Sequence, residues 1–413
     1  MAHKGAPGTG TNQEGVRRHN LGTLLGHLHR SGRISRAELT SRMGLNRSTI
    51  AGLVAELESL GVAEQVEPSG VRIGAGRPSV DVKPTDSGAY VLASEVRVDG
   101  LIVARVGLGG AVLARATAPI PASHDPEDVA DAVVELLRIV TKDVPNRAAL
   151  VGVGVSIPGI VGAVDGVVRL APNLGWSDVP FAKILGARLG SIGVPVLGND
   201  ADLGALAEHN RGAAVDLGDL IYLSGDVGIG AGVIVGGRAL EGAGGYAGEI
   251  GHLSHAPDGQ LCRCGNRGCW ETEIGAGSIA HAIGCPPEQI AALGEHLDSV
   301  TDPSEELKVV GQHLGRGLAS VVNLLNPQAI ILGGYLRALY PLVKADVDAT
   351  LEARALHAPH EQVQILLPGL GGDSVLLGAA EVAFQPLLAD PVAALARACR
   401  DVESELADRV SHG

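Results

Sequence analysis

The chain has 413 residues, of which 46% are hydrophobic, and a formal net charge of −14 at pH 7. This length exceeds what one ordinary hydrophobic core needs, so two or three domains are expected. The longest apolar runs fall short of the ~18 residues of a membrane helix, and residues 1–11 lack the apolar stretch of a signal peptide. These features exclude an integral membrane protein and predict a cytoplasmic, globular one.

Charge is distributed unevenly along the chain. Residues 1–85 carry 11 Lys and Arg against 7 Asp and Glu, whereas the remainder carries 21 against 39. A basic end on an acidic body suggests that only this end faces a polyanion such as DNA. On charge alone, an ordinary solvated helical surface remains the alternative.

The N-terminal region shows three helical segments after a predicted disordered tail at residues 1–14. Leucines at helical spacing predict a first helix from about Val16 to Arg30. A capping box that begins at Ser35 predicts the start of a second helix, which Gly44 ends. Asn46 is a good cap for a third, longer helix. The order of short helix, turn and longer helix is typical of a helix-turn-helix motif.

Candidate DNA-binding residues lie on the third helix and in a loop behind it. Arg47, Ser48 and Thr49 occupy the exposed first turn of that helix, which in such folds enters the major groove. Strands are predicted at Ala63–Val66 and Ser79–Val82. The loop between them resembles the wing of a winged helix, and its Arg77 is the candidate for a minor-groove or phosphate contact. Residues 15–84 are therefore predicted to form a winged helix-turn-helix domain, joined to the body by a linker at residues 83–88.

From Tyr90 onward the pattern changes to alternating strands and helices, which predicts an α/β body. The main predicted elements are the strands Tyr90–Val96, Leu101–Leu108, Val112–Ala118, Leu150–Ser156, Asp219–Leu223 and Ala231–Val235, and the helices Pro126–Lys142 and Glu305–Leu325.

The most informative stretch places one histidine and three cysteines within an 18-residue window. His252, Cys262, Cys264 and Cys269 form a set that suits a tetrahedral structural zinc site. Gly265 and Gly268 would allow tight turns between the ligands, because glycine reaches positive φ without penalty. The alternatives are disulfides or free buried thiols. Disulfides are disfavoured because the chain shows no signal peptide, so a reduced compartment is expected.

This window resembles the signature of the ROK family, which comprises bacterial sugar kinases and sugar-responsive repressors. The matching residues are Gly248-Glu249-Ile250-Gly251-His252 and the run Cys262-x-Cys264-Gly265-x-x-Gly268-Cys269-x-Glu271, and the resemblance extends from about Tyr90 to about Ala383. It implies an actin-like ATPase (ribonuclease H-like) body with a zinc knuckle. The implied lobes are residues 88–200 with 374–390, and residues 201–373 with the knuckle and sugar site; residues 391–413 would form a C-terminal helix and tail.

The resemblance also implies a set of sugar-binding residues: Asn173, Asn199, Asp200, Glu249, His252 and Glu271. Carboxylates and amides suit a hexose, whose hydroxyls both donate and accept hydrogen bonds. In the kinases, the residue that matches Asp200 is the general base, so here it is a catalytic residue if activity persists and a sugar ligand otherwise. Trp176, in the same neighbourhood, is expected either in the core or against the sugar.

The phosphate-binding motif of the kinases is degenerate in this chain. Glu95, Arg97 and Asp99 stand where the family carries Asp-x-Gly-x-Thr, and Asp226 adds a second acid near the phosphate positions. Lost space and like charge both oppose nucleotide binding, so ATP use is not expected.

These observations predict a DNA-binding transcriptional regulator of carbohydrate metabolism, in particular a repressor. Its expected partners are a double-stranded DNA operator and a small sugar or sugar phosphate, its cofactor is structural Zn²⁺, and it is expected to be a homodimer or homotetramer because DNA half-sites are repeated. One alternative is an ATP-dependent hexose kinase with a DNA-binding appendage. Another is a zinc-stabilised scaffold for a protein partner.

Overall fold

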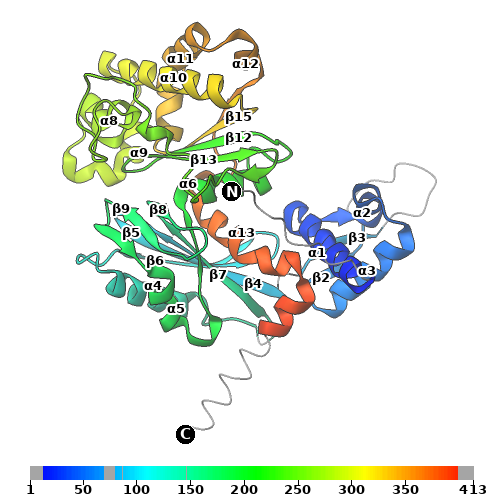
Figure 1. The fold of residues 1–413 in the computed structure, drawn as a ribbon. Helices are drawn as coiled ribbons and strands as arrows, with labels where there is room; N and C mark the ends of the chain where they lie inside the picture. The colour runs from blue at the N-terminus through cyan, green and yellow to red at the C-terminus, as the bar shows by residue number, and fades with distance from the viewer. Residues whose placement is uncertain (1–12, 69–79, 86, 146, 399–413) are drawn as a thin grey trace, which may run out of the picture.

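The computed structural model describes residues 13–68, 80–85, 87–145 and 147–398. An N-terminal unit lies beside an α/β body that contains two five-stranded sheets, one above the other in Figure 1. Residues 1–12 of the predicted disordered tail and the wing with Arg77 lie outside the described residues, whereas Gln13 and Glu14 begin the first helix.

The N-terminal unit combines three helices with a three-stranded antiparallel sheet of order β1-β3-β2. Its elements are α1 (Gln13–Ser31), β1 (Ile34–Ser35), α2 (Arg36–Met43), α3 (Arg47–Ser59), β2 (Ala63–Val66) and β3 (Asp81–Pro84). The three predicted helices and the strand Ala63–Val66 are confirmed. The second predicted strand was placed too early, because the ladder with β2 runs on to Pro84.

Local capping explains why the helix starts were predictable. The Ser35 hydroxyl accepts a hydrogen bond from the Glu38 amide at 3.1 Å, and the Asn46 side chain accepts one from the Thr49 amide at 2.9 Å. Asn46 Oδ1 also accepts from the hydroxyls of Ser48 and Thr49. These bonds satisfy amides that have no partner within the first turn of a helix.

The first sheet of the body has the order β11-β7-β4-β5-β6. Its strands are β4 (Ala89–Val96), β5 (Gly100–Gly107), β6 (Val112–Pro119), β7 (Ala149–Ile157) and β11 (Val196–Asn199), and a small sheet of β8 (Ile160–Val161), β9 (Val168–Ala171) and β10 (Trp176–Val179) accompanies it. Helices α4 (Pro126–Val140) and α5 (Phe181–Leu189) share a core with Leu92, while α13 (Ser374–Ala389) shares one with Val91. Successive side chains of β4 thus point to opposite, covered faces.

The second sheet has the order β14-β13-β12-β15-β16. Its strands are β12 (Leu220–Gly225), β13 (Ile229–Val235), β14 (Arg238–Ala239), β15 (Ala329–Gly334) and β16 (Gln364–Leu366). The helices that pack on it or around it are α6 (Asp200–Arg211), α7 (Trp270–Ile274), α8 (Ala276–Ile283), α9 (Leu293–Asp298), α10 (Glu305–Leu325), α11 (Leu336–Arg354) and α12 (His357–Gln362), with short 3₁₀ turns at Gly190–Ile192, Ile250–His252, Pro287–Ala292 and Gly371–Asp373. Residues of α6 share a core with the face of the sheet opposite that of α10.

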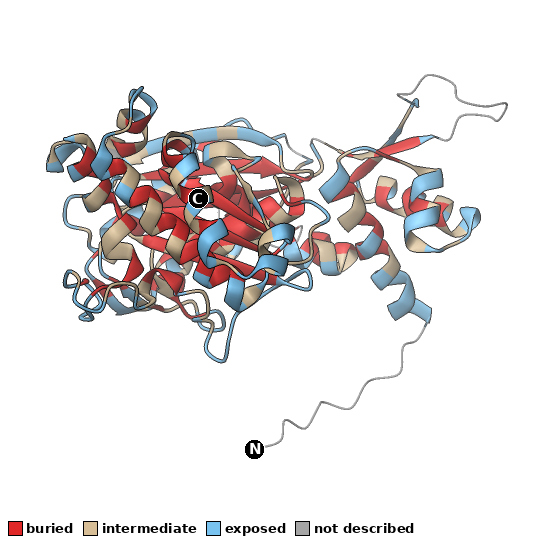
Figure 2. Ribbon diagram, turned by 90° about the horizontal axis from the view of Figure 1, so that it is seen from above, coloured by how far each residue is buried: buried red, intermediate tan, exposed pale blue. Residues whose placement is uncertain are grey.

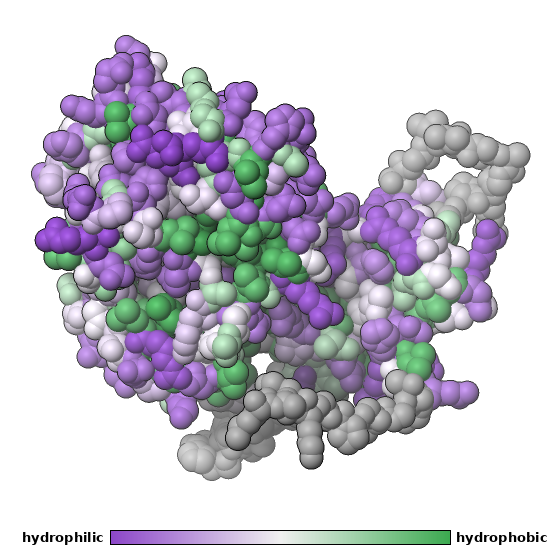
Figure 3. Space-filling model, turned by 45° about the horizontal axis from the view of Figure 1, so that its top comes forward, coloured by the Kyte–Doolittle hydropathy of each residue, from purple (hydrophilic) through white to green (hydrophobic). Residues whose placement is uncertain are grey.

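The strand and helix predictions for the body are confirmed, but the linker prediction was wrong at its start. Lys83 and Pro84 belong to β3, and the Thr85 amide donates to the Val62 carbonyl at 3.2 Å. The N-terminal unit is joined to the body by packing as well, because Leu24 and Leu28 of α1 share one buried cluster with Phe384 and Leu387 of α13. Figure 2 shows that α1 carries buried residues where it approaches the body. Figure 3 shows the N-terminal unit at the side of the body, with many hydrophilic residues on its outer surface.

Among the described residues, no single helix is long and apolar enough to cross a membrane. One bent pair, Gly371–Ala389 with Pro391–Ala398, reaches that length and composition only when its two arms are taken together.

Candidate functional site

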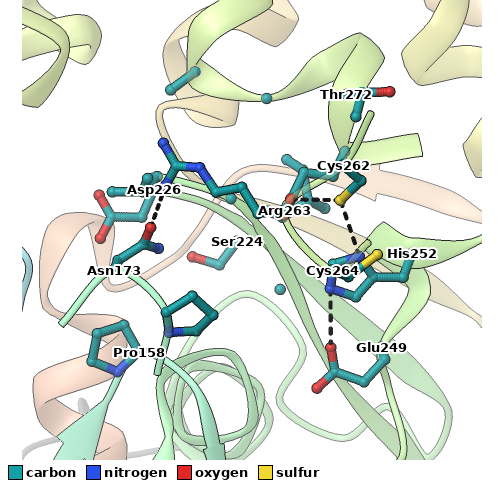
Figure 4. A pocket seen from close by; sticks show the side chains of 18 of the residues that line it. Pro158, Asn173, Ser224, Asp226, Glu249, His252, Cys262, Arg263, Cys264 and Thr272 are labelled. Atoms are coloured by element: carbon teal, nitrogen blue, oxygen red, sulfur yellow. Dashed lines mark hydrogen bonds and ion pairs between the residues drawn. The ribbon is translucent and has the colours of Figure 1, made fainter. Parts of the chain in front are cut away.

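A cleft of about 1020 Å³ is lined by residues of both sheets and of the loops that follow them. All six predicted sugar-binding side chains line it: Asn173, Asn199, Asp200, Glu249, His252 and Glu271. They come from four separate stretches of sequence, and Figure 4 shows Asn173, Glu249 and His252 around the same hollow.

The junction of β11 and α6 positions the first pair of candidates. Asn199 caps α6, since its Oδ1 accepts from the amides of Ala201 and Asp202 at 2.8 and 3.2 Å, and its Nδ2 donates to the Gly159 carbonyl at 2.9 Å. Most of the hydrogen-bonding capacity of Asn199 therefore serves the backbone. Asp200 occupies the first position of the helix, where its Oδ1 accepts from the Ala201 amide at 2.9 Å.

The carboxyl groups of the cleft are crowded, and this changes their protonation. Burial, reinforced by Asp226 and Glu249, raises the pKa of Asp200 to about 7. Burial, reinforced by Asp200 and Glu249, likewise raises the pKa of Asp202 to about 7. Burial also raises the pKa of Glu249, although His252, 3.9 Å away, opposes the shift. Near neutral pH Asp200 and Asp202 therefore offer both donors and acceptors, which suits a ligand made of hydroxyl groups.

Glu271 connects the cleft with the cysteine cluster. One carboxylate oxygen accepts from the Ile229 amide at 2.9 Å, and the other lies 3.6 Å from the Cys262 sulfur. The side chain is thereby held between the start of β13 and the cluster.

The predicted metal ligands converge. The ligand atoms of His252, Cys262, Cys264 and Cys269 all lie within 4.8 Å of one another. The Cys264 and Cys269 sulfurs are 3.6 Å apart, and His252 Nδ1 is 3.7 Å from the Cys262 sulfur. Edges of about 3.5–3.8 Å are those of a tetrahedron around a zinc ion with ordinary Zn–S and Zn–N bonds. All three cysteines are free, so the set fits a metal and not a disulfide.

The two glycines of the cluster adopt the conformation that was predicted for them. Gly265 has φ of 92° and Gly268 has φ of 67°, which L side chains rarely adopt. A β-carbon on Gly268 would lie 1.4 Å from the Ala256 carbonyl oxygen. The chain between the ligands can therefore close only with glycine there.

Sequence reasoning missed Arg263, which lies between two cysteine ligands and extends across the cleft. Its guanidinium donates to the Asn173 side-chain oxygen, so the metal cluster of one lobe contacts a loop of the other (Figure 4). The sequence contained a signal for Arg263, because a residue between two metal ligands has a backbone held in a defined position. Asp202 also lines the cleft and was missed as well, because residues two apart on a helix do not normally face the same side.

The degenerate phosphate motif lies on the β4–β5 hairpin beside the same cleft. Arg97 Nε contacts the Asp99 carboxylate at 3.3 Å, so both substituted side chains occupy the hairpin as an ion pair. Glu95, 9% exposed, has one carboxylate oxygen without a hydrogen-bond partner among the described residues. Burial raises the pKa of Glu95 to about 7; Arg97 opposes this rise, while Asp226, Asp200 and Asp373 add to it.

Glu95→Gln is expected to stabilise the protein above pH 7. A carboxyl whose folded pKa is raised binds more protons folded than unfolded, so its contribution to stability falls as pH rises from its unfolded pKa near 4.5 through about 7. The variant should therefore gain on the order of 1–2 kcal/mol at pH 8 and almost nothing at pH 4. Urea unfolding at both pH values measures this; equal effects at the two would contradict it.

The structure also decides the alternative left open for Trp176 and shows the surroundings of Cys285 and of the candidate DNA-binding residues. Trp176 is a core residue: it is 3% exposed, stacks near Phe181 at 4.9 Å, and donates from its indole nitrogen to the His124 carbonyl. Cys285 is a free, partly buried thiol outside the cluster. Arg47 and Ser48 are exposed on the first turn of α3, whereas Thr49 is partly buried.

Two α/β lobes that enclose one polar cleft define the actin-like sugar-kinase fold. The chain belongs to the ROK family, whose model matches residues 98–385.

Relatives of this chain include regulators that match nearly its whole length. The xylose repressor of Bacillus subtilis (strain 168) is 27% identical over 379 residues, which cover 90% of this chain and 97% of the relative. A crystal structure of a ROK family transcriptional regulator, a homologue of the E. coli MLC protein, has a TM-score of 0.72 at 24% identity and covers 93% of this chain and 99% of its own.

A kinase of the family matches less of the chain. The ROK glucokinase from Streptomyces griseus, solved with glucose and AMPPNP, has a TM-score of 0.62 at 25% identity and covers 72% of this chain and 99% of its own. The difference in coverage places this protein in the regulator branch, whose members extend beyond the kinase body.

Proposed function

We propose that this protein is a sugar-responsive transcriptional repressor. The observation that carries the proposal is the combination, in one packed chain, of a basic three-helix unit with a cleft lined by all six side chains that were predicted to bind a sugar. The near full-length match to a xylose repressor supports it. The protein acts in the cytoplasm, on an operator in double-stranded DNA.

The N-terminal unit is the DNA-binding part, a winged helix-turn-helix. Helix α2, the turn at Gly44 and α3 follow in the order of that motif, and the antiparallel β2–β3 pair carries the loop predicted as a wing. Arg47, Ser48 and Thr49 would face the major groove. Asn46 already binds both hydroxyls, so Arg47 is the side chain of the three that is most available for base contacts.

The cleft is the effector site, and the metal is structural zinc held by His252, Cys262, Cys264 and Cys269. When bound, the metal would hold the backbone of the knuckle in place. Glu249 and Glu271 lie against this knuckle, so their positions depend on it.

The charge of the cleft favours an uncharged sugar over a sugar phosphate. Among the described residues that line it, seven are Asp or Glu, while Arg263 is the one Arg or Lys. Arg263 already donates to Asn173. A phosphate dianion would therefore meet like charge, whereas neutral hydroxyls would find acceptors.

Fluorescence anisotropy on DNA from upstream of the gene tests the function. D-xylose, D-glucose and N-acetyl-D-glucosamine would each be compared with the corresponding sugar phosphate, at two salt concentrations. One neutral sugar is expected to change DNA affinity by about 5–150-fold, and the phosphates much less. Weak, steeply salt-dependent binding that ignores DNA sequence and sugar would show only a basic patch.

A kinase is the second candidate, and Asp200 favours it, because a carboxyl with a pKa of about 7 suits a general base. The Arg97–Asp99 pair in the phosphate hairpin opposes it. ATP-dependent phosphorylation of a hexose that Asp200→Asn abolishes would establish this activity.

We propose a homodimer or homotetramer as the assembled form, since operators repeat their half-sites.

A further inference from the structure

Helix α6 joins the two functional parts of the molecule. It begins in the cleft with the Asn199 cap and Asp200, and it ends twelve residues later at Arg211. In Figure 1 it lies between the two lobes, next to α13, which runs on toward the N-terminal unit. The helix therefore has one end at the effector site and the other at the junction with the DNA-binding unit.

The end of α6 is held by a buried polar network. Arg211 Nε donates to Glu381 Oε1 at 2.7 Å, and Arg211 Nη1 donates to the Gly109 carbonyl at 2.7 Å. Asn210 Nδ2 donates to the other Glu381 oxygen at 2.8 Å. Thus consecutive residues of α6 hold one carboxylate of α13.

The same network includes a residue of the N-terminal unit. His29 of α1 is fully buried, and its Nε2 lies 3.2 Å from Glu381 Oε1 and 2.8 Å from Arg211 Nη2. Its Nδ1 accepts from the Gly109 amide at 3.0 Å, and the Arg211 guanidinium also faces the His29 carbonyl. Four segments far apart in sequence therefore share one buried cluster: α1, the β5–β6 turn, α6 and α13.

This cluster resists small displacements. Burial would raise the pKa of Glu381, but His29 and Arg211 outweigh it and lower the pKa to about 2, so the carboxylate is charged and depends on both partners. A buried charge that loses a partner is costly, so the members move together or not at all.

Packing makes α6 and α13 a rigid pair. A β-carbon on Gly378 would lie 1.9 Å from the Leu203 carbonyl oxygen, so the two helices touch along their backbones. Glu208, also on α6, accepts from the amides of Gly369 and Leu370 and from the Ser374 hydroxyl. A shift at the start of α6 is therefore passed along the helix and not absorbed within it.

We infer that α6 transmits the state of the cleft to the DNA-binding unit through Arg211, Glu381 and His29. The inference rests on the proposed function, since it names how the effector site would control DNA binding. Arg211 acts here as a positioning residue, in contact with neither sugar nor DNA.

The chain offers a matched control for the test. Arg18 of α1 pairs with Asp390, at the end of α13, at 3.4 Å. This second ion pair also joins the N-terminal unit to the body, but it includes no residue of α6. Arg18→Gln removes a contact between the N-terminal unit and the body but leaves Arg211, Glu381 and His29 unchanged. Arg211→Lys keeps the positive charge but loses the planar guanidinium that binds several partners at once.

The experiment measures hydrogen exchange of the α1 amides in the full-length chain. The cleft is perturbed in two ways, by saturating D-xylose or N-acetyl-D-glucosamine and by Asp200→Asn, which replaces an ionisable carboxyl at the start of α6 with a neutral amide. Wild type and Arg18→Gln are expected to show the same change in exchange at residues 21–31. In Arg211→Lys the change should shrink by roughly three-fold or more, while calorimetry shows unaltered sugar affinity.

The inference is overturned if the change in α1 hydrogen exchange in Arg211→Lys is as large as in wild type. It is also overturned if Arg18→Gln reduces that change as much as Arg211→Lys does. His29→Gln, which keeps a donor toward Glu381, gives the same test if Arg211→Lys does not fold. If neither sugar binds wild type, the effector part of the proposed function fails, and Asp200→Asn still decides the inference. If the wild-type protein does not bind DNA, the proposed function as a repressor is contradicted, while the hydrogen-exchange experiment still tests the inference about α6.

Discussion

Cys269→Ser is expected to prevent metal binding by the cysteine cluster and to weaken the response to sugar. Cys269 is 1% exposed, lies 3.6 Å from the Cys264 sulfur, and directly precedes the fully buried Trp270. Loss of one ligand from a four-ligand site should lower the free energy of unfolding by about 2–5 kcal/mol, a fraction of what structural zinc contributes in small domains. Sugar affinity should fall by about 10–100-fold, because Glu271 and Glu249 lose their support.

Elemental analysis of the purified protein, thermal unfolding and calorimetry with sugar check this prediction. Cys285→Ser is the matched control, since Cys285 is a free thiol outside the cluster. It should keep the metal and the sugar response. Wild-type protein that carries no zinc, or a Cys269→Ser variant that binds sugar as tightly as wild type, would contradict the prediction.

Arg47→Ala is expected to weaken specific DNA binding by about 5–150-fold, which corresponds to the ~1–3 kcal/mol of one bidentate base contact. Arg47 is exposed at the start of α3, the position from which a recognition helix reaches base edges. The loss should be larger on the operator than on unrelated DNA, because a base contact carries sequence information whereas a phosphate contact does not.

Anisotropy titrations with operator and scrambled DNA measure this effect. Arg337→Ala is the control: Arg337 is exposed on α11, in the body, and its loss changes net charge equally. Equal losses on both DNAs would assign Arg47 to the phosphate backbone, and equal losses in both variants would reduce its role to net charge.

Local patterns were sufficient to predict the three N-terminal helices and the main strands and helices of the body, but not shorter elements such as β8, β10 and α12. Ser35 and Asn46 cap the helices that they were predicted to start, because a cap is decided by residues within one turn. The long helix Glu305–Leu325 was predicted to the residue from its continuous apolar stripe, and the structure adds that Ser304 caps it. The metal ligands were also predictable, because their spacing along one short segment limits where they can meet.

Long-range packing decided the rest. His29, Arg211 and Glu381 are far apart in the sequence, and they form one cluster only because α1, α6 and α13 pack against one another. The raised pKa values of Glu95, Asp200 and Asp202 have the same origin, since burial and mutual repulsion exist only in the folded cleft. The position of Trp176 was equally undecidable, because a large amphipathic ring suits a core and a sugar alike.

The sequence by itself determined the main helices and strands, the set of candidate metal ligands and the family of this protein, because each rests on neighbouring residues or a contiguous motif. Only the tertiary structure decided that Arg263 crosses the cleft to Asn173, and that the N-terminal unit shares a core with the body and is not suspended from a linker. Contacts between residues that are 90 or more positions apart depend on how whole elements pack, and no local pattern encodes that geometry.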